Sequence, residues 1–280
     1  MDIVRRAFTE DAGGGDVTSE AVIPEGKTAE GIISAGGDCV LSGIDVAVAV
    51  FHTADPSLQC TKAAEDGAVL KPAERVLRVT GAARPILAAE RTALNFLQLM
   101  SGISTLTARF VAVAAEHGVE VLDTRKTAPT LRVLEKHAVR CGGGVNHRMG
   151  LHDRVLMKDN HLQAVAAEGS ANLKRTVEKL RRDKPGLQIE IEVEREEQLE
   201  EILALKPDWI LLDNMNSEQL RQCVRLCAGQ CKLEASGEID LDTLEDTART
   251  GVNAVSVGRL THSAPASPFS LEFLPGVSGQ

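Results

Sequence analysis

The second half of the chain alternates short apolar segments with helical patterns, and this alternation restricts the fold more than any other feature. The apolar segments span residues 119–123, 154–158, 187–193, 209–213, 231–236 and 254–258. Amphipathic patterns such as 196–205 and 243–248 lie between them. Strands separated in this way by helices pair in parallel through right-handed crossovers. Six such units predict an α/β barrel, closed or partly open.

The first part of the chain has a different pattern. Glycines and prolines separate strand-like runs at 29–34, 39–43, 68–70 and 76–79, which predicts an antiparallel, β-rich domain. A helical pattern then covers residues 88–115, and the pair Ser101-Gly102 predicts a break within it.

Each apolar segment of the second half ends in polar or small residues. In chain order they are Asp123 to Lys126, Lys158, Glu192, Asp213, Ser236-Gly237 and Gly258. A single strand that ends at a polar residue means little. Because the carboxyl ends of parallel barrel strands open on one mouth, where active sites lie, the series predicts one shared site.

The cations of the chain are concentrated in the middle of the sequence. Residues 121–161 hold eight lysines and arginines against four acids, a net charge of +4, whereas the whole chain carries −9. A solvated basic face is the ordinary interpretation of such a run. Here the cations stand among short apolar runs and the glycines of the stretch GGGVNHRMG at 142–150, so we favour a pocket.

The predicted mouth combines two kinds of group. Its cationic half, suited to carboxylates or phosphates, consists of Arg125, Lys126, His147, Arg148 and Lys158. Glu192 and Asp213 suit ribose hydroxyls, a Mg²⁺ ion or a developing cation. Backbone N–H groups of the loops EASGE and SVGR can bind a phosphate. The residues therefore predict a polyanionic substrate, and they leave His147 open as a general acid/base or as a structural residue.

Composition excludes several other functions. The chain has six Phe, one Trp and no Tyr, which argues against base stacking, and its acidic balance argues against binding a nucleic-acid backbone. We expect no membrane span and no signal peptide, and therefore a cytoplasmic protein. Among six cysteines, Cys223, Cys227 and Cys231 are spaced by four, but Gly229 predicts a helix end before the last of them. Buried thiols are favoured over a metal site there.

Long motifs give the chain a family resemblance. In order they read EDAGGGDVTSE, ERTALNFLQLMSGIST, LDTRKTAP, EKHAVRCGGGVNHRMGLHDRVLMKDNH, IEIEVE, ILLDN, LEASGEI and VSVGRLTHSAP. They resemble quinolinate phosphoribosyltransferases over almost the whole chain. The resemblance implies transfer of phosphoribosyl from phosphoribosyl pyrophosphate to quinolinate with decarboxylation. The products are nicotinate mononucleotide, pyrophosphate and CO₂, in NAD biosynthesis, and Mg²⁺ is the implied cofactor.

The resemblance also implies a domain organisation. An N-terminal α/β sandwich would span residues 1–102 and be completed by a C-terminal tail, 263–280. An incomplete barrel of about seven strands would occupy residues 103–262. The minimal active unit implied is a homodimer, with Arg91 reaching the partner's site, and the assembly beyond a dimer stays open.

Site residues follow from the resemblance motif by motif. Arg125, His147, Arg148 and Lys158 would hold the quinolinate carboxylates, with Lys126 beside them. Glu192 and Asp213 would bind ribose and metal and stabilise an oxocarbenium-like transition state; with Lys126 and Lys158 they form the expected catalytic set. The phosphate-binding set would comprise Ser236, Gly237, Glu238, Val257, Gly258 and Arg259.

Two departures and two rival functions accompany this assignment. Glu238 stands where the family has glycine, and Arg259 stands where a small or apolar residue is common, so that it can compensate the added acid. One rival is the phosphoribosyltransferase-like relative found in molybdate operons, which the motifs KDNH and NHR disfavour. The other is a non-catalytic anion-binding barrel, which would have no need of Glu192 and Asp213.

Overall fold

The computed structural model describes residues 2–166 and 171–274, which belong to two compact units. The N-terminal unit comprises Met1–Ala108, Thr127–Gly143 and Leu260–Gln280. The barrel unit comprises Arg109–Lys126 and Gly144–Arg259. The division expected from the sequence, at residue 102, places 127–143 with the barrel, whereas the structure groups this segment with the N-terminal unit. The last six residues of the expected tail, 275–280, lie outside the described residues.

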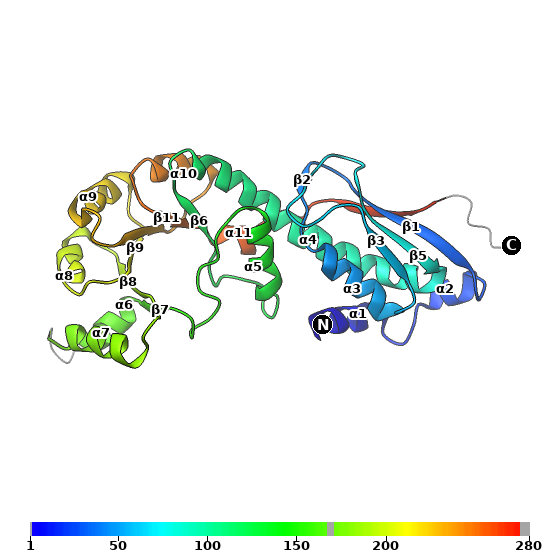
Figure 1. Cartoon of the computed structure of the whole chain (residues 1–280), viewed down its shortest axis with the longest axis horizontal. Helices are drawn as coiled ribbons and strands as arrows, with labels where there is room; N and C mark the ends of the chain where they lie inside the picture. The colour runs from blue at the N-terminus through cyan, green and yellow to red at the C-terminus, as the bar shows by residue number, and fades with distance from the viewer. Residues whose placement is uncertain (1, 167–170, 275–280) are drawn as a thin grey trace. The chain divides into compact units, whose positions relative to one another are not determined.

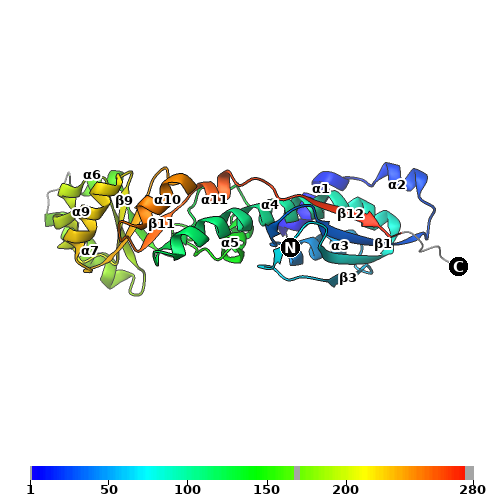
Figure 2. The same cartoon turned by 90° about the horizontal axis from the view of Figure 1, so that it is seen from above.

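The N-terminal unit is built on an antiparallel sheet. Its strand order is β12-β1-β5-β3, with the strands β1 (Thr28–Ala35), β3 (Gln59–Lys62), β5 (Arg75–Ala82) and β12 (Phe269–Phe273). Strand β12, which lies beside β1 in Figure 2, pairs antiparallel with it from Gly31 opposite Phe273 to Ala35 opposite Phe269. A two-stranded ladder joins β2 (Cys39–Val40) and β4 (Val69–Leu70).

Helices complete this unit. They are α1 (Asp2–Ala12), α2 (Val17–Val22), α3 (Ile44–Ala54), most of α4 (Ala83–Ala115) and α5 (Arg132–Cys141). Helix α11 (Arg259–His262) stands at the start of the last chain segment of this unit. The core between helices and sheet includes the fully buried side chains of Ile33, Phe51 and Leu77. The apolar side chains of the inner sheet face and of one stripe on each helix are thus removed from contact with water. Their burial provides the main driving force for folding.

Helix α4 corrects one expectation from the sequence, because it runs unbroken through Ser101-Gly102. The Ser101 Oγ accepts a hydrogen bond from the Ser42 N–H, so this serine ties the helix to the loop before α3. A Cβ built on Gly102 would lie 2.2 Å from the carbonyl oxygen of Pro265. The glycine therefore permits close approach of another backbone and does not end the helix.

The barrel unit contains a six-stranded parallel sheet within the described residues. Its order is β6-β11-β10-β9-β8-β7, with the strands β6 (Glu120–Leu122), β7 (Val155–Met157), β8 (Ile189–Val193), β9 (Trp209–Asp213), β10 (Lys232–Ser236) and β11 (Ala254–Ser256). A single parallel bridge between Leu122 and Val145 extends the β6 edge. The predicted open α/β barrel is confirmed, with six strands and one bridge in place of about seven strands.

Helices surround this sheet in Figure 1. In chain order they are α6 (Asp159–Ala166), α7 (Ala171–Asp183), a 3₁₀ turn (Glu196–Gln198) followed by α8 (Leu199–Leu203), α9 (Ser217–Cys227) and α10 (Leu241–Ala248). Helix α9 ends through Ala228 and Gly229, both at positive φ, before Cys231. The predicted helix end at Gly229 is therefore confirmed. Leu122, Trp209 and Ala254 pack together as a small apolar cluster of the sheet.

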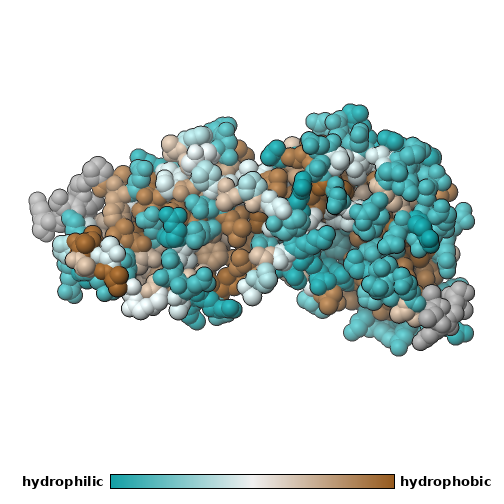
Figure 3. Space-filling model, turned by 180° about the vertical axis from the view of Figure 1, so that it is seen from behind, coloured by the Kyte–Doolittle hydropathy of each residue, from teal (hydrophilic) through white to brown (hydrophobic). Residues whose placement is uncertain are grey.

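The surface mixes polar and apolar residues, as the face in Figure 3 shows. Among the described helices, α4 alone is long and apolar enough to meet a length-and-composition criterion for crossing a membrane, and half of the qualifying stretch is buried. A core helix meets the same criterion, and α4 buries Ile86, Leu97 and Phe110 completely.

The close contact at Gly102 generates a stability prediction. In an exposed helix interior, Gly→Ala adds about 1 kcal/mol of stability. At Gly102 the added methyl overlaps the Pro265 carbonyl, so we expect Gly102→Ala to lower the free energy of unfolding by about 1–3 kcal/mol. Urea titration measures the change. Gly14→Ala, where an added Cβ meets nothing within 4 Å, is the matched control; equal stabilities of the two variants would contradict the close contact.

Candidate active site

The parallel register brings polar residues into one row at the carboxyl ends of the strands. Ser236 of β10 pairs with Asp213 of β9 on one side and with Ser256 of β11 on the other. Paired residues of parallel strands point to the same face of a sheet, so the three side chains lie side by side. This row forms part of the mouth that the strand ends predict.

A cavity of about 560 Å³ opens at this mouth. Its volume lies within the roughly 300–1,000 Å³ of typical small-molecule sites. The residues that line it are Thr124, Arg125, Lys126, His147, Arg148, Leu156, Lys158, Leu211, Asp213, Asn214, Glu234, Ser236, Gly237, Glu238 and Ser256. Nine of the predicted site residues therefore share one cavity within the barrel unit.

The cations enter this cavity from three loops. Arg125 and Lys126 follow β6, Arg148 follows the Leu122–Val145 bridge, and Lys158 follows β7. Burial and the nearby charge of Arg125 lower the pKa of the Arg148 guanidinium. Positive charges that line one cavity repel one another, and an anionic ligand relieves that repulsion.

Asp123 fixes the loop that carries His147 and Arg148. This carboxylate is fully buried at the end of β6, where it accepts hydrogen bonds from Asn146 Nδ2 at 2.6 Å and from the His147 N–H at 2.9 Å. The motif NHR is thereby tied to the strand that precedes the cationic loop. Removal of this anchor would leave two loop donors unsatisfied.

Below the mouth, His147 lies between two fully buried carboxylates. Its Nε2 is 3.0 Å from Glu190 Oε2 and 3.4 Å from Glu234 Oε2, while its Nδ1 lies 2.7 Å from the backbone nitrogen of Arg148. Arg154 adds a cation, with its Nε 3.4 Å from Glu190 Oε2. Burial alone lowers the pKa of His147, but hydrogen bonds to the two carboxylates and their charges outweigh it and raise the pKa to about 9. Burial also raises the pKa of Glu190, so the cluster retains protons.

A group of acids lies beside Lys158. Carboxylate oxygens of Glu192, Glu194 and Asp213 lie within 4.8 Å of one another, and Lys158 Nζ is 2.5 Å from Glu192 Oε2. Three convergent carboxylates are the donor set that Mg²⁺ and other hard cations prefer, and the residues present fit such an ion. The Lys158 ammonium already supplies one positive charge beside Glu192.

Some of the predicted phosphate-binding residues line the cavity, whereas Val257 is buried. Gly237 has φ +137°, and a Cβ there would lie 2.7 Å from Asn214 Oδ1, so the backbone needs glycine at this position. Glu238 is exposed and lines the cavity. Val257 is fully buried, and its N–H donates to the Leu122 carbonyl. The Val257 N–H, which was predicted to bind a phosphate, therefore already donates a hydrogen bond within the sheet.

Arg259 does not line the cavity, and Arg91 belongs to the other unit. Arg259 pairs with Asp240, the N-cap of α10, at 3.7 Å, which differs from the expectation that it compensates Glu238. Arg91 is exposed on the part of α4 that belongs to the N-terminal unit.

The structure places several residues at or next to the site that were not predicted from the sequence. They are Glu190, Glu194, Asn214, Glu234 and Ser256. For Glu190 and Glu194 the sequence did contain a signal. These acids and Glu192 alternate with Ile191 and Val193 along β8 and its end, which is the two-residue period of a strand. All three acids therefore share the inner face.

Comparisons with known proteins agree with this geometry. Residues 103–272 match the family model of the quinolinate phosphoribosyl transferase C-terminal domain, and residues 16–101 match that of the N-terminal domain. The chain is 41% identical over 268 residues to the nicotinate-nucleotide pyrophosphorylase (carboxylating) of Mycobacterium leprae, covering 94% of this chain and 93% of that protein. A probable enzyme of that name from Bacillus subtilis is 38% identical over 272 residues, covering 96% and 92%. The solved structure of the Francisella tularensis nicotinate-nucleotide pyrophosphorylase is 34% identical with a TM-score of 0.91, covering 98% and 95%.

The buried cluster around His147 generates a prediction of pH dependence. The folded pKa of His147, about 9, lies above its ordinary value of 6.5. Stability linked to this proton is therefore complete below pH 6.5 and is lost as the pH rises through 9; the raised pKa of Glu190 acts in the same direction. We expect the free energy of unfolding to fall by a few kcal/mol over this range. Urea titrations at several pH values measure it.

A matched pair of variants isolates this linkage. His147→Gln should flatten the pH dependence, whereas His152→Gln, on an exposed loop residue, should leave it intact. A slope that survives in His147→Gln would place the responsible proton elsewhere.

Proposed function

The chain belongs to the quinolinate phosphoribosyltransferase family, and from this premise we propose how the residues of the mouth divide the reaction. The enzyme transfers phosphoribosyl from phosphoribosyl pyrophosphate to quinolinate with decarboxylation, giving nicotinate mononucleotide, pyrophosphate and CO₂ in NAD biosynthesis. The observation that carries the division is the single cavity, which has cations from the 125–158 segment on its lining and Asp213 with its acidic neighbours beside them.

The cations hold quinolinate. Arg125 and Arg148 offer planar guanidinium groups that grip carboxylates in two parallel hydrogen bonds, and Lys126 and Lys158 add point charges. The two carboxylates of quinolinate lose much of their hydration on entering the cavity, so fixed positive groups must replace the water. The lowered pKa of Arg148 reflects the desolvation and repulsion that a bound dianion offsets.

The chemistry needs charge stabilisation more than proton transfer. The pyridine nitrogen forms a bond to C1 of the ribose as the bond from C1 to the pyrophosphate oxygen breaks, and pyrophosphate takes that electron pair. The C2 carboxylate then leaves as CO₂, and its electron pair stays on C2 beside the positive nitrogen until a proton arrives. Positioning of the two substrates and a preorganised electrostatic environment account for the rate enhancement.

The acids act on the ribose side. Glu192, Glu194 and Asp213 would hold Mg²⁺ and the ribose hydroxyls, and their negative charge favours the cationic character that develops at C1. When bound, Mg²⁺ neutralises pyrophosphate oxygens. Lys158 links the two halves, because its ammonium lies 2.5 Å from Glu192 and also lines the cavity.

The 5′-phosphate is assigned to the small residues after β10 and β11. Ser236 and Ser256 contribute hydroxyl groups in register, and the backbone at Gly237 and Gly258 has no side chain to obstruct a phosphate. We assign His147 a positioning role, since both of its ring nitrogens already contact Arg148 or the two buried carboxylates.

Assembly and location complete the proposal. A homodimer in which Arg91 reaches the partner's site suits the exposure of this arginine on α4. A reducing compartment, the cytoplasm, suits the six free cysteines. Plant relatives bear names that place them in mitochondria or chloroplasts, among them the proteins from Nicotiana tabacum and rice.

A direct assay separates the enzyme from a binding protein of the same fold. The chain should convert quinolinate and phosphoribosyl pyrophosphate to nicotinate mononucleotide when Mg²⁺ is added, as chromatography of the products will show. Binding of quinolinate without release of pyrophosphate would favour a non-catalytic anion-binding barrel.

Arg148→Ala tests the carboxylate side. We expect quinolinate binding to weaken at least 100-fold, because loss of a desolvated bidentate pair costs about 3 kcal/mol or more, whereas binding of phosphoribosyl pyrophosphate changes little. Calorimetry with each substrate measures the two affinities. Arg249→Ala, on an exposed helix end, is the control. An equal loss of both affinities would refute the assignment of Arg148.

Glu194→Gln tests the acidic side with a residue that the sequence alone did not single out. Removal of one carboxylate charge should raise the Mg²⁺ concentration at half-maximal activity several-fold, while kcat at saturating Mg²⁺ is largely retained. Glu197→Gln, exposed on the following turn, should behave as the unchanged protein. An unaltered Mg²⁺ requirement in Glu194→Gln would remove this residue from the metal site.

A further inference from the structure

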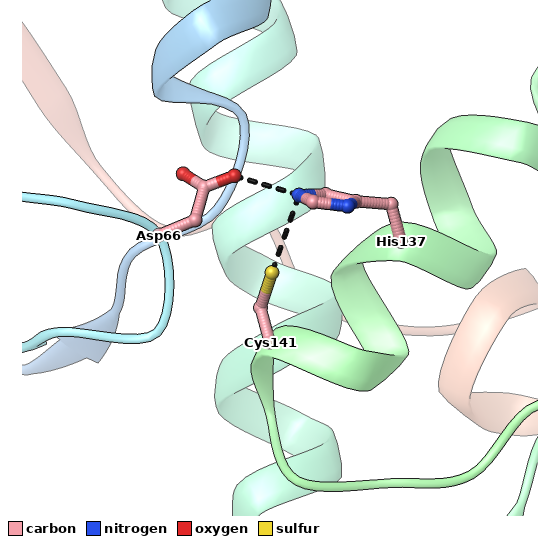
Figure 4. A group of neighbouring side chains, drawn as sticks. All are labelled: Asp66, His137 and Cys141. Carbon is pink, nitrogen blue, oxygen red and sulfur yellow. Dashed lines mark hydrogen bonds and ion pairs between the residues drawn. The ribbon is translucent and has the colours of Figure 1, made fainter.

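A second group of metal-ligating side chains lies in the N-terminal unit, within residues that the reaction does not use. Asp66 comes from the loop between β3 and β4, and His137 and Cys141 lie one turn apart on α5 (Figure 4). One oxygen, one nitrogen and one sulfur of these residues lie within 4.8 Å of one another. The three side chains are half-buried, and that of His137 is 40% exposed, so the group is accessible to solvent ions.

The loop holds Asp66 in place. Its Oδ1 accepts the N–H of Ile44 at 3.0 Å, which satisfies a donor at the start of α3, where Gly43 provides no side-chain cap. Backbone bonds from Gly67 N to Leu41 O and from Leu41 N to Ala68 O fix the loop on either side. Because capping uses one carboxylate oxygen, Oδ2 remains directed at His137. Such outer contacts orient ligands in metal sites.

Both neighbours of His137 contact the same ring nitrogen. Asp66 Oδ2 is 2.7 Å and Cys141 Sγ is 3.3 Å from Nε2, as the two dashed lines in Figure 4 show. In a nucleophile–histidine–carboxylate relay the two partners contact opposite nitrogens. A shared nitrogen cannot serve such a relay, because Asp66 and Cys141 both contact Nε2. An oxygen, a nitrogen and a sulfur gathered within 4.8 Å of one another instead match the ligands of a metal ion.

We propose that Asp66, His137 and Cys141 form a Zn²⁺ site, with water as the fourth ligand. Thiolate, imidazole and carboxylate are the three ligand types that zinc takes in proteins, and a third ligand from a loop completes a pair on a helix. Bond lengths of about 2.0–2.3 Å at tetrahedral angles separate ligand atoms by roughly 3.3–3.6 Å. The sulfur-to-nitrogen distance already has this value, and the carboxylate needs to move outward by less than an ångström.

Neighbouring groups are compatible with the ion. Arg140 Nη2 lies 3.4 Å from the other ring nitrogen, Nδ1, but Arg140 is exposed and can turn into solvent when that nitrogen carries the proton. The site is chemically distinct from the acids of the mouth, because a sulfur and a nitrogen ligand select zinc over Mg²⁺. An ion here would clamp the 65–67 loop to α5.

Zinc binding to the purified full chain tests the proposal, with ZnCl₂ alone as the titrant and saturating Mg²⁺ present to occupy the acids of the mouth. We expect one equivalent of zinc to bind, and Cys141→Ser and His137→Gln each to weaken that binding at least tenfold. Cys60→Ser, a half-buried thiol in the same unit, and Cys227→Ser, in the barrel unit, should bind as the unchanged chain does. Circular dichroism confirms that each variant is folded.

Cobalt provides a spectroscopic readout that is independent of affinity. Co²⁺ at the site should give a thiolate-to-cobalt charge-transfer band and the intense visible bands of a tetrahedral complex. Cys141→Ser should lose the charge-transfer band, whereas Cys60→Ser should keep it. Absence of a bound equivalent of zinc, or loss of the band in Cys227→Ser rather than Cys141→Ser, would overturn the site.

Discussion

Two carboxylates inside the parallel sheet, Glu190 and Glu234, impose the constraint on which the mouth depends. Both are fully buried, where an isolated ionised group costs many kcal/mol unless a cation or proton compensates it. His147 and Arg154 provide that compensation. The loop from Asn146 to Arg154 is therefore held from below by these buried charges and from the side by Asp123. The buried charges and Asp123 together fix the position of Arg148, which lies in this loop.

The distribution of charge explains why an acidic chain binds anions. Cations come from the loops after β6 and β7 and from the segment between them, whereas acids come from the ends of β8 and β9. Adjacent strands thus supply opposite signs to one opening, and Lys158 with Glu192 marks the boundary. A substrate pair that combines a dianion with a developing cation fits an opening divided in this way.

Much of this arrangement could be predicted from the sequence, for physical reasons that also set the limits. Buried parallel strands are continuous apolar runs, so all six could be located, and their polar ends identified the mouth.

Strand β3 was missed because its residues, QCTK, are mostly exposed and lack an apolar pattern. The break expected at Gly102 is wrong because the glycine makes room for Pro265, a residue far away in sequence, and does not end the helix. Glu234 was missed because local patterns do not show which charges meet inside a barrel, whereas for Glu190 the alternation along β8 was an available signal. The same limit applies to His137 and Asp66, which are 71 residues apart.

The pairing of β12 with β1 has a consequence for the order of folding. Strand β1 lies near the beginning of the chain, and its partner follows the last strand of the barrel unit. During synthesis one edge of the N-terminal sheet therefore stays open until every barrel strand has been made. Unpaired strand edges are templates for association with other chains, and contacts so distant in sequence form slowly. The nascent N-terminal unit is thus exposed to misassociation for most of its translation, and the closing of its sheet is a late event of folding.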